Sequence, residues 1–176
     1  RLDKSAIGAF AELATVRESD AARKPGNLTH IEAASIPLVG LTSWQVMQDM
    51  MGLKSGQTIL IHAGSGGVGT FAIQLAKYLG AIVATTASAR NAELVRRLGA
   101  DIVVDYKTQR FEDVVKEPDF VFDTQGGELL MRSIAITSRC VAASSHGCEA
   151  CPGSARATIF IQMIRFSPTD TAKTSP

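Results

Sequence analysis

The sequence predicts an α/β fold built on a doubly wound parallel sheet, and three observations lead to this prediction. From residue 58 to residue 123, short apolar runs alternate with stretches of helical periodicity, and such alternation produces parallel strands joined by right-handed crossovers. The runs at 82–84 and 102–104 are almost continuously apolar, as expected for strands that are covered on both faces. A glycine-rich turn at 64–69 joins the first run directly to the first helix.

The elements of this sheet follow one another closely along the chain. In the first helix, apolar residues recur at helical spacing from Val68 through Leu75 to Leu79, which predicts one face packed on the sheet. The expected strands are 58–62, 82–86, 102–104 and 119–123, and the expected helices are 67–79, 91–98 and a short one near 110–115.

The upstream residues predict further elements. Residues 8–16 alternate between apolar and small or polar side chains, which is typical of a strand. Thr29 and Glu32 have the spacing of a capping box, so a short helix is expected to begin there. Pro37 is expected to end or kink this helix, and the apolar residues of 38–51 continue a helical pattern.

Composition and charge exclude several classes of protein. The 176 residues, 45% of them hydrophobic, suffice for one well-buried domain and part of a second. The 18 basic and 17 acidic side chains are spread along the chain and leave a net charge of +1, which argues against a nucleic-acid partner. No apolar run reaches the roughly 20 residues of a membrane span. Because the cysteines fall outside the expected core, we expect a reducing compartment, either the cytoplasm or an organellar lumen.

The domain organisation is expected to be that of a fragment. The chain starts at Arg1 without an initiating methionine, and its regular pattern stops after about Thr137. We expect the remnant of one domain at 1–37, the sheet domain at 38–137 and an irregular or aberrant tail at 138–176. Truncation and a shifted reading frame near residue 137 both explain the loss of pattern.

The glycine-rich turn indicates a dinucleotide site. In Gly64-x-Gly66-x-x-Gly69 the first glycine allows a tight turn, the second lets the backbone approach a pyrophosphate, and the third lets the helix pack closely on its strand. The helix then points its free N–H groups at the phosphates. A P-loop is excluded, because Thr70 stands where that motif needs lysine. The alternative is a tight packing turn that binds no ligand.

The end of the second strand favours NADP over NAD. An NAD enzyme places a carboxylate there to bind the ribose hydroxyls, but residues 85–90 contain none, which also argues against a methyltransferase. Ser88 and Arg90 offer a hydroxyl donor and a planar cation to a 2′-phosphate. The alternative is that Ser88 or Asn91 caps a helix and that Arg90 is merely solvated.

Two further segments are placed at the carboxyl edge of the sheet, where ligands bind. Tyr106 follows the third strand and is expected to cover the adenosine end of the cofactor, unless it is an ordinary strand-end aromatic. Thr124, Gly126 and Gly127 follow the fourth strand, and this small turn is expected to lie against the nicotinamide ring, unless it is a simple turn.

Several ordered motifs over about residues 7–135 resemble one known family. They are Gly-Ala-Phe-Ala-Glu, Ala-Ala-Ser-Ile-Pro-Leu-Val-Gly-Leu-Thr-Ser-Trp-Gln, Ile-His-Ala-Gly-Ser-Gly-Gly-Val-Gly, Leu-Gly-Ala-Asp and Phe-Asp-Thr-Gln-Gly-Gly. The sequence is similar to the zinc-independent quinone oxidoreductase branch of the medium-chain dehydrogenase/reductases. The resemblance implies a Rossmann domain after a GroES-like β domain, of which 1–37 would be the C-terminal remnant. It also implies NADPH as cofactor, a quinone or α,β-unsaturated carbonyl as small-molecule substrate, and a homodimer.

The same resemblance implies roles for individual residues. Ser65, Gly67 and Val68 would line the pyrophosphate, Ser88 and Tyr106 would contact the 2′-phosphate side, and Thr42 would approach the nicotinamide. No catalytic acid is assigned. The chain departs from the family at 137–141, where Thr-Ser-Arg-Cys-Val replaces a glycine-containing turn. We therefore expect a Rossmann sheet that is incomplete after the fourth or fifth strand.

The remaining histidines and cysteines are given modest roles. Cys148-x-x-Cys151, with Cys140 and His146 nearby, could supply four zinc ligands. A second well-spaced pair is lacking, so no metal site is expected. His62 is interpreted as a hydrogen-bonding residue at a strand end rather than as a base.

The sequence thus leads to a hypothesis with two alternatives. The leading hypothesis is an NADPH-dependent oxidoreductase, or its cofactor-binding part, that transfers hydride to a quinone or an α,β-unsaturated carbonyl. One alternative is a module that binds NADPH as a sensor or docking domain without turnover. The other is a non-functional truncated product.

Overall fold

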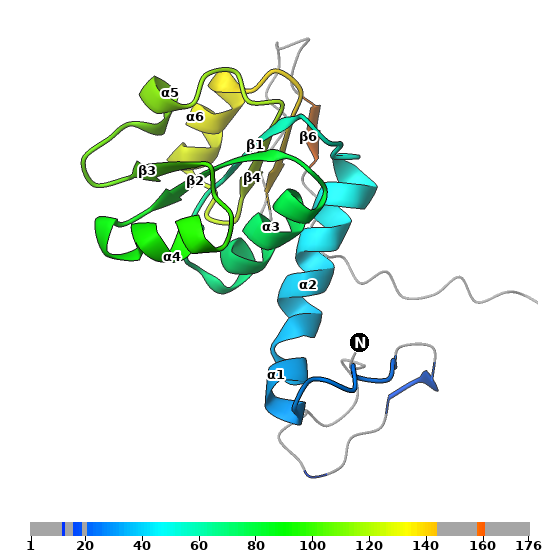
Figure 1. The fold of residues 1–176 in the computed structure, drawn as a ribbon. Coiled ribbons are helices and arrows are strands. Elements are labelled where there is room, and N and C mark those ends of the chain that lie inside the picture. Colours follow the sequence, from blue (N-terminus) through cyan, green and yellow to red (C-terminus); the bar gives the residue numbers. More distant parts are fainter. Residues whose placement is uncertain (1–11, 13–15, 19–20, 144–157, 161–176) are drawn as a thin grey trace, which may run out of the picture. The chain divides into compact units, whose positions relative to one another are not determined.

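The computed structural model describes residues 12, 16–18, 21–143 and 158–160 (Figure 1). The chain divides into two compact units, Arg1–Pro37 and Leu38–Pro176. Most of the strand expected at 8–16 lies outside the described residues, and the assignment of 1–37 to a GroES-like remnant stays a prediction.

The described part of the first unit contains the capped helix that the sequence predicted. Helix α1 covers His30–Ala34. The Glu32 backbone N–H donates to Thr29 Oγ1 at 3.2 Å, and the Thr29 N–H donates to Glu32 Oε2 at 2.8 Å, which completes the capping box. A new helix, α2, starts at Ile36, with Pro37 in its first turn, where the missing proline N–H removes no hydrogen bond. The expected interruption near Pro37 is confirmed.

Helix α2 covers Ile36–Trp44 and continues as a π-helical segment, η2, over Gln45–Met50. The wider turn is visible in the hydrogen bond from Met51 N to Val46 O at 2.9 Å. Gly52 follows at φ +58, the left-handed conformation that commonly ends a helix. The sequence predicted this helical stretch but not its change of pitch.

The second unit contains a parallel sheet with the strand order β3-β2-β1-β4-β5-β6 (Figure 1). In the central strand, Ile59 pairs with Val83 on one side and with Phe120 on the other. The strands are β1 Thr58–Ile61, β2 Ile82–Ala87, β3 Ile102–Asp105, β4 Phe120–Asp123, β5 Cys140–Ala143 and β6 Thr158–Phe160. The helices after α2 are α3 Gly67–Tyr78, the 3₁₀ turn η3 Ala89–Asn91, α4 Ala92–Arg97, α5 Phe111–Val114 and α6 Glu128–Ile136.

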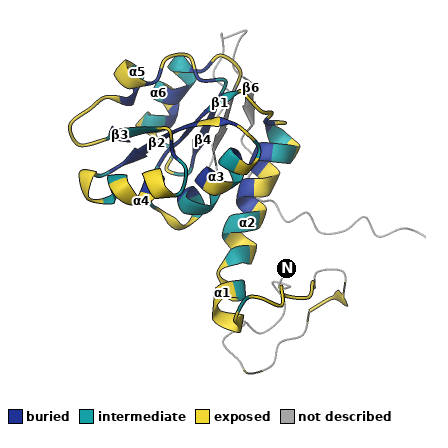
Figure 2. Cartoon of the chain, in the orientation of Figure 1, coloured by how far each residue is buried: buried dark blue, intermediate teal, exposed yellow. Residues whose placement is uncertain are grey.

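Helices cover both faces of this sheet, because alternate strand residues point to opposite sides. Ile59 and Ile61 pack with residues of η2, α3 and α4, whereas Leu60 packs with residues of α5 and α6. In Figure 2 most residues of β1, β2 and β4 are buried and the outer surfaces of the helices are exposed. Residues 69, 72, 73 and 76 form the buried stripe of α3 at helical spacing. The predicted doubly wound Rossmann fold is confirmed.

Two parts of the sheet domain differ from the expectation. Helix α6 was not predicted, although it supplies one wall of the candidate site described below. Strands β5 and β6 also continue the sheet past the fourth or fifth strand, where it was expected to be incomplete. The Cys-Val-Ala-Ala of β5 contains no long apolar side chain, and no glycine turn precedes it as one precedes β1, β2 and β3. Its position follows from parallel pairing with β4, which sequence periodicity does not reveal.

Candidate nucleotide-binding site

The candidate site lies at the carboxyl ends of β1, β2, β3 and β4. Strand β1 sits between β2 and β4, and the chain crosses from one face of the sheet to the other around it. In doubly wound sheets such a switch point leaves a crevice between the loops, and ligands bind there.

Packing explains two glycines of the turn that joins β1 to α3. A Cβ on Gly64 would collide with Thr85 Oγ1, whose hydroxyl donates to Ile61 O at 2.7 Å. A Cβ on Gly69 would collide with Ala63 O and would lie 2.7 Å from the Gly64 Cα. The turn can therefore be this tight only with glycine at both positions.

The same turn presents backbone N–H groups to the site. Gly66 is the N-cap of α3, and its N–H donates to Ala63 O at 2.9 Å. The N–H groups of Gly67, Val68 and Gly69 belong to the first turn of α3, where no carbonyl of the helix can accept them. Together with the positive end of the helix dipole, they suit an anion such as a pyrophosphate.

The residues after β2 are arranged as a polar rim. Ser88 is half-buried, Arg90 is exposed, and neither Ser88 nor Asn91 makes a side-chain capping hydrogen bond. Ser88 and Asn91 thus occupy the N-cap positions of η3 and α4 without a side-chain capping bond, and the choice between a cofactor role and a helix cap stays open. Asn91 Nδ2 instead donates to Ser65 Oγ at 3.0 Å, which ties this rim to the glycine-rich turn.

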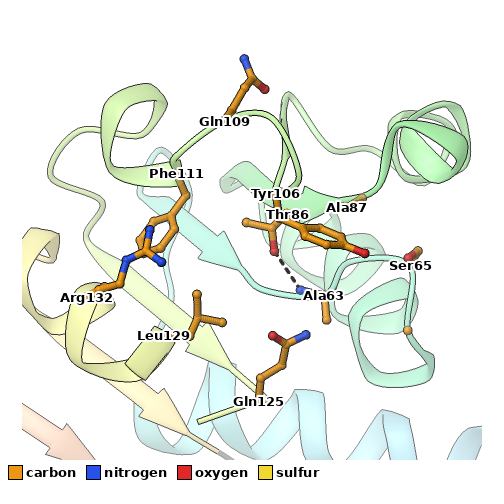
Figure 3. Close-up of a pocket in the computed structure, with 11 residues that line it drawn as sticks. Ala63, Ser65, Thr86, Ala87, Tyr106, Gln109, Phe111, Gln125, Leu129 and Arg132 are labelled. Atoms are coloured by element: carbon orange, nitrogen blue, oxygen red, sulfur yellow. Dashed lines mark hydrogen bonds between the residues drawn. The ribbon is translucent and has the colours of Figure 1, made fainter. Parts of the chain in front are cut away.

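A pocket of about 550 Å³ opens beside these loops (Figure 3). The pocket contains Ser65, Gly66 and Tyr106, which the sequence assigned to the cofactor. Figure 3 shows the Tyr106 ring on the same side as Ser65, and Phe111, Leu129 and Arg132 on the opposite side. The lining residues are Ala63, Ser65, Gly66, Thr86, Ala87, Tyr106, Gln109, Phe111, Gln125, Leu129 and Arg132.

Arg132 of α6 forms a wall of the pocket that is held by an ion pair. Its Nε and Nη2 donate to the two carboxylate oxygens of Glu112 at 2.6 and 2.9 Å, and its guanidinium lies 4.9 Å from the centre of the Phe111 ring. The hydrogen bonds from Arg132 lower the pKa of Glu112 and raise that of Arg132. The pair therefore stays ionised and joins α5 to α6.

His62 is fully buried behind the pocket lining, in contact with Thr86 and Phe111. Its Nδ1 is 3.3 Å from Thr86 Oγ1, its Nε2 is 2.9 Å from Ser133 Oγ, and its ring meets Phe111 edge to face at 4.9 Å. Burial away from water lowers the pKa of His62 to about 4, and the nearby Asp123 carboxylate offsets only part of that effect. His62 is thus neutral near pH 7, and its predicted role as a strand-end hydrogen-bonding residue is confirmed.

A buried carboxylate shapes the turn after β4. Asp123 Oδ1 accepts the Gln125 N–H at 2.8 Å, and Oδ2 accepts the Gly126 N–H at 3.1 Å. Gly126 and Gly127 adopt φ values of +74 and +67, which favour glycine. The turn therefore has a defined conformation, and it starts helix α6.

Several residues assigned from the sequence lie outside the pocket lining. Thr42 is buried in α2, and its hydroxyl donates to Leu38 O at 2.7 Å. The others are Gly64, Gly67, Val68, Gly69, Ser88, Arg90, Thr124 and Gly126. The four residues of the glycine-rich turn in this list flank Ser65 and Gly66 in the sequence, and those two residues do line the pocket.

Sequence reasoning missed the residues that α5 and α6 contribute. Phe111, Leu129 and Arg132 reach the pocket because these helices pack on the face of the sheet opposite α3. One signal was available: the apolar residues of 128–136 recur at helical spacing directly after a Gly-Gly turn.

A metal site and a membrane-spanning helix can be assessed for the described residues only. No group of three or more His, Cys, Asp or Glu that could hold a metal ion occurs among them. His146, Cys148 and Cys151 lie outside these residues, so the expectation about zinc stays a prediction. Within the same part of the chain, none of the helices has the length and apolarity needed to span a bilayer.

Comparison with known proteins identifies the family. A family model described as zinc-binding dehydrogenase matches residues 67–148. The mitochondrial NAD(P)H oxidoreductase RTN4IP1 of Homo sapiens is 43% identical over 127 residues, which cover 68% of this chain and 32% of that protein. The chain belongs to the medium-chain dehydrogenase/reductase superfamily. The resemblance found in the sequence is thereby confirmed.

Two further proteins show a similar degree of likeness to this chain. The 2-methylene-furan-3-one reductase of Solanum lycopersicum is 41% identical over 122 residues, covering 68% of this chain and 31% of that protein. The solved quinone oxidoreductase of Coxiella burnetii is 38% identical with a TM-score of 0.67, covering 70% of this chain and 40% of that chain. The chain thus spans about a third of the length of these curated relatives.

Proposed function

We propose that this chain forms the NADPH-binding part of an oxidoreductase that transfers hydride from the cofactor to a quinone or an α,β-unsaturated carbonyl. The observation that carries the proposal is the turn between β1 and α3. Close packing requires glycine at Gly64 and Gly69, and the first helical N–H groups of α3 have no acceptor within the helix. A pyrophosphate at this turn would accept these N–H groups.

NADPH rather than NADH is proposed because of the rim after β2. Arg90 is exposed and forms no hydrogen bond or ion pair with the described residues, and the Ser88 side chain is not used as a cap. Both groups are free to contact a 2′-phosphate, whereas no residue of 82–90 is a carboxylate that would repel it. The name of the human relative, an NAD(P)H oxidoreductase, supports a nicotinamide cofactor without choosing between the two.

The remaining residues are proposed in the roles that the resemblance implies. Ser65 and Tyr106, which both line the pocket, would contact the adenosine side of the cofactor. Thr42 and the Thr124–Gly126 turn would lie toward the nicotinamide. The proposed acceptor follows from relatives named as quinone and furanone reductases. A homodimer and a location in the cytoplasm or an organellar lumen also remain proposals.

The experiment compares the affinity of the protein for NADPH and NADH by calorimetric titration. We expect NADPH to bind more tightly, and we expect Arg90→Gln to weaken NADPH binding about tenfold while NADH is unaffected, because only NADPH carries the extra phosphate. Arg96→Gln is the matched control, since Arg96 is an exposed arginine of the neighbouring helix α4. Equal affinity for both cofactors would refute the NADPH assignment.

A second measurement addresses turnover. Oxidation of NADPH is followed by its absorbance in the presence of a panel of quinones and enones. Turnover that saturates with one of these acceptors supports the proposed reaction. Tight NADPH binding without turnover of any acceptor would instead support a cofactor-binding sensor or docking module.

A further inference from the structure

Four consecutive hydrogen bonds form a network beneath the pocket. The Ala63 N–H donates to Thr86 Oγ1 at 3.0 Å, and Thr86 Oγ1 lies 3.3 Å from His62 Nδ1. On the other side of the ring, His62 Nε2 lies 2.9 Å from Ser133 Oγ, which donates to Leu129 O at 2.8 Å. Figure 3 shows the first of these bonds as a dashed line between Thr86 and Ala63.

The available donors and acceptors determine which group donates in each bond of this network. Ser133 has one hydroxyl hydrogen, which it donates to Leu129 O, so Ser133 Oγ must accept the hydrogen bond that His62 Nε2–H donates. Nδ1 of the neutral ring is then an acceptor, and Thr86 donates to it while accepting the Ala63 N–H. One assignment therefore makes every one of these hydrogen bonds at once, and it requires the neutral Nε2–H form of His62.

Ala63, at one end of this network, has an unusual backbone conformation. Ala63 has φ +53, in the left-handed region that residues with a side chain rarely adopt. Its carbonyl accepts the Gly66 N–H, and its own N–H is held by Thr86. The conformation of Ala63 thus sets the direction in which the following turn presents its N–H groups.

We propose that His62 is a positioning residue for the phosphate-binding turn, because its Nδ1 orients the Thr86 hydroxyl that holds Ala63 in the left-handed conformation. Ser133 and the edge of Phe111 fix the ring in the rotation that this role needs. His62 itself does not line the pocket, so it acts through Thr86 and Ala63 rather than by contact with the cofactor. The inference rests on the proposed function, since it assumes that this turn binds NADPH.

Two substitutions of His62 test the hydrogen bonds of its two ring nitrogens separately. His62→Asn places an amide oxygen near the position of Nδ1 and keeps an acceptor for Thr86. His62→Gln extends an amide toward the position of Nε2 and keeps the contact with Ser133 instead. We expect His62→Gln to weaken NADPH binding about tenfold or more, and His62→Asn to weaken it no more than about threefold.

A mutant cycle excludes a purely structural explanation. Thr86→Val preserves the shape of Thr86 and removes its hydroxyl, so it should weaken NADPH binding as much as His62→Gln does. The double variant should be no weaker than the weaker single variant, because both act through the same hydrogen bonds. Urea unfolding of every variant reports stability separately from affinity.

The outcomes are distinguishable. Equal NADPH affinity in His62→Asn and His62→Gln, or additive losses in the mutant cycle, would overturn the positioning role even if the wild-type protein binds NADPH. Affinity losses that simply follow the stability losses would overturn it as well. Failure of the wild-type protein to bind NADPH at all would refute the proposed function itself.

Discussion

Lowering the pH should destabilise the protein through His62. Burial lowers the pKa of this imidazole from its ordinary value of 6.5 to about 4 in the folded protein. Between these two values the unfolded chain binds a proton that the folded protein does not bind. The free energy of unfolding therefore falls as the pH falls through this window.

The magnitude follows from the two pKa values. Since a tenfold change in proton affinity corresponds to about 1.4 kcal/mol, the whole window is worth about 3 kcal/mol, of which about 2 kcal/mol is lost between pH 7 and pH 5. Typical domains have only about 5–15 kcal/mol of stability in total, so the loss is readily measured. Urea unfolding followed by circular dichroism at several pH values is the appropriate assay.

Two control variants test whether His62 causes this pH dependence of the free energy of unfolding. In His62→Asn the group that titrates is absent, so its free energy of unfolding should be nearly constant between pH 7 and pH 5, although lower overall. His30→Gln removes an exposed histidine of α1 and should keep the wild-type pH dependence. An equal pH dependence in the wild type and in His62→Asn would refute the reasoning.

Three further perturbations test the loops and walls of the site. Gly69→Ala should cost roughly 1–3 kcal/mol of stability in urea titrations, because the new methyl group meets backbone atoms of the turn. Gly67→Ala is the control and should change the stability little, because a methyl group at Gly67 makes only an ordinary van der Waals contact. Glu112 and Arg132 should show a coupling of about 0.5–1 kcal/mol in a double-mutant cycle, decreasing with added salt; no coupling would mean that the pair does not stabilise the wall. Gly127→Ala should cost about 1–3 kcal/mol by thermal unfolding from backbone strain alone, since nothing lies within 4 Å of the new methyl group; an unchanged melting temperature would contradict the strain.

The part of the site that is local in sequence could be predicted. The glycine turn, the first strand and α3 are consecutive, and periodicity together with glycine spacing determines them. The wall formed by α5 and α6 depends instead on which face of the sheet each helix covers. The contact between His62 and Ser133 joins residues 71 positions apart, and no local pattern signals it. The collision of Gly64 with Thr85 is likewise known only once β1 and β2 are paired.

The strand order has a consequence for synthesis of the protein. Strand β1 pairs with β2 soon after both have been made, but its other neighbour, β4, begins about 60 residues further along the chain. At about 5–20 residues per second, the ribosome leaves one side of the central strand unpaired for about 3 to 12 seconds. An unpaired apolar strand edge is a template for association with other chains. Chaperone dependence should therefore be greatest after β1 has left the ribosome and before β4 has done so.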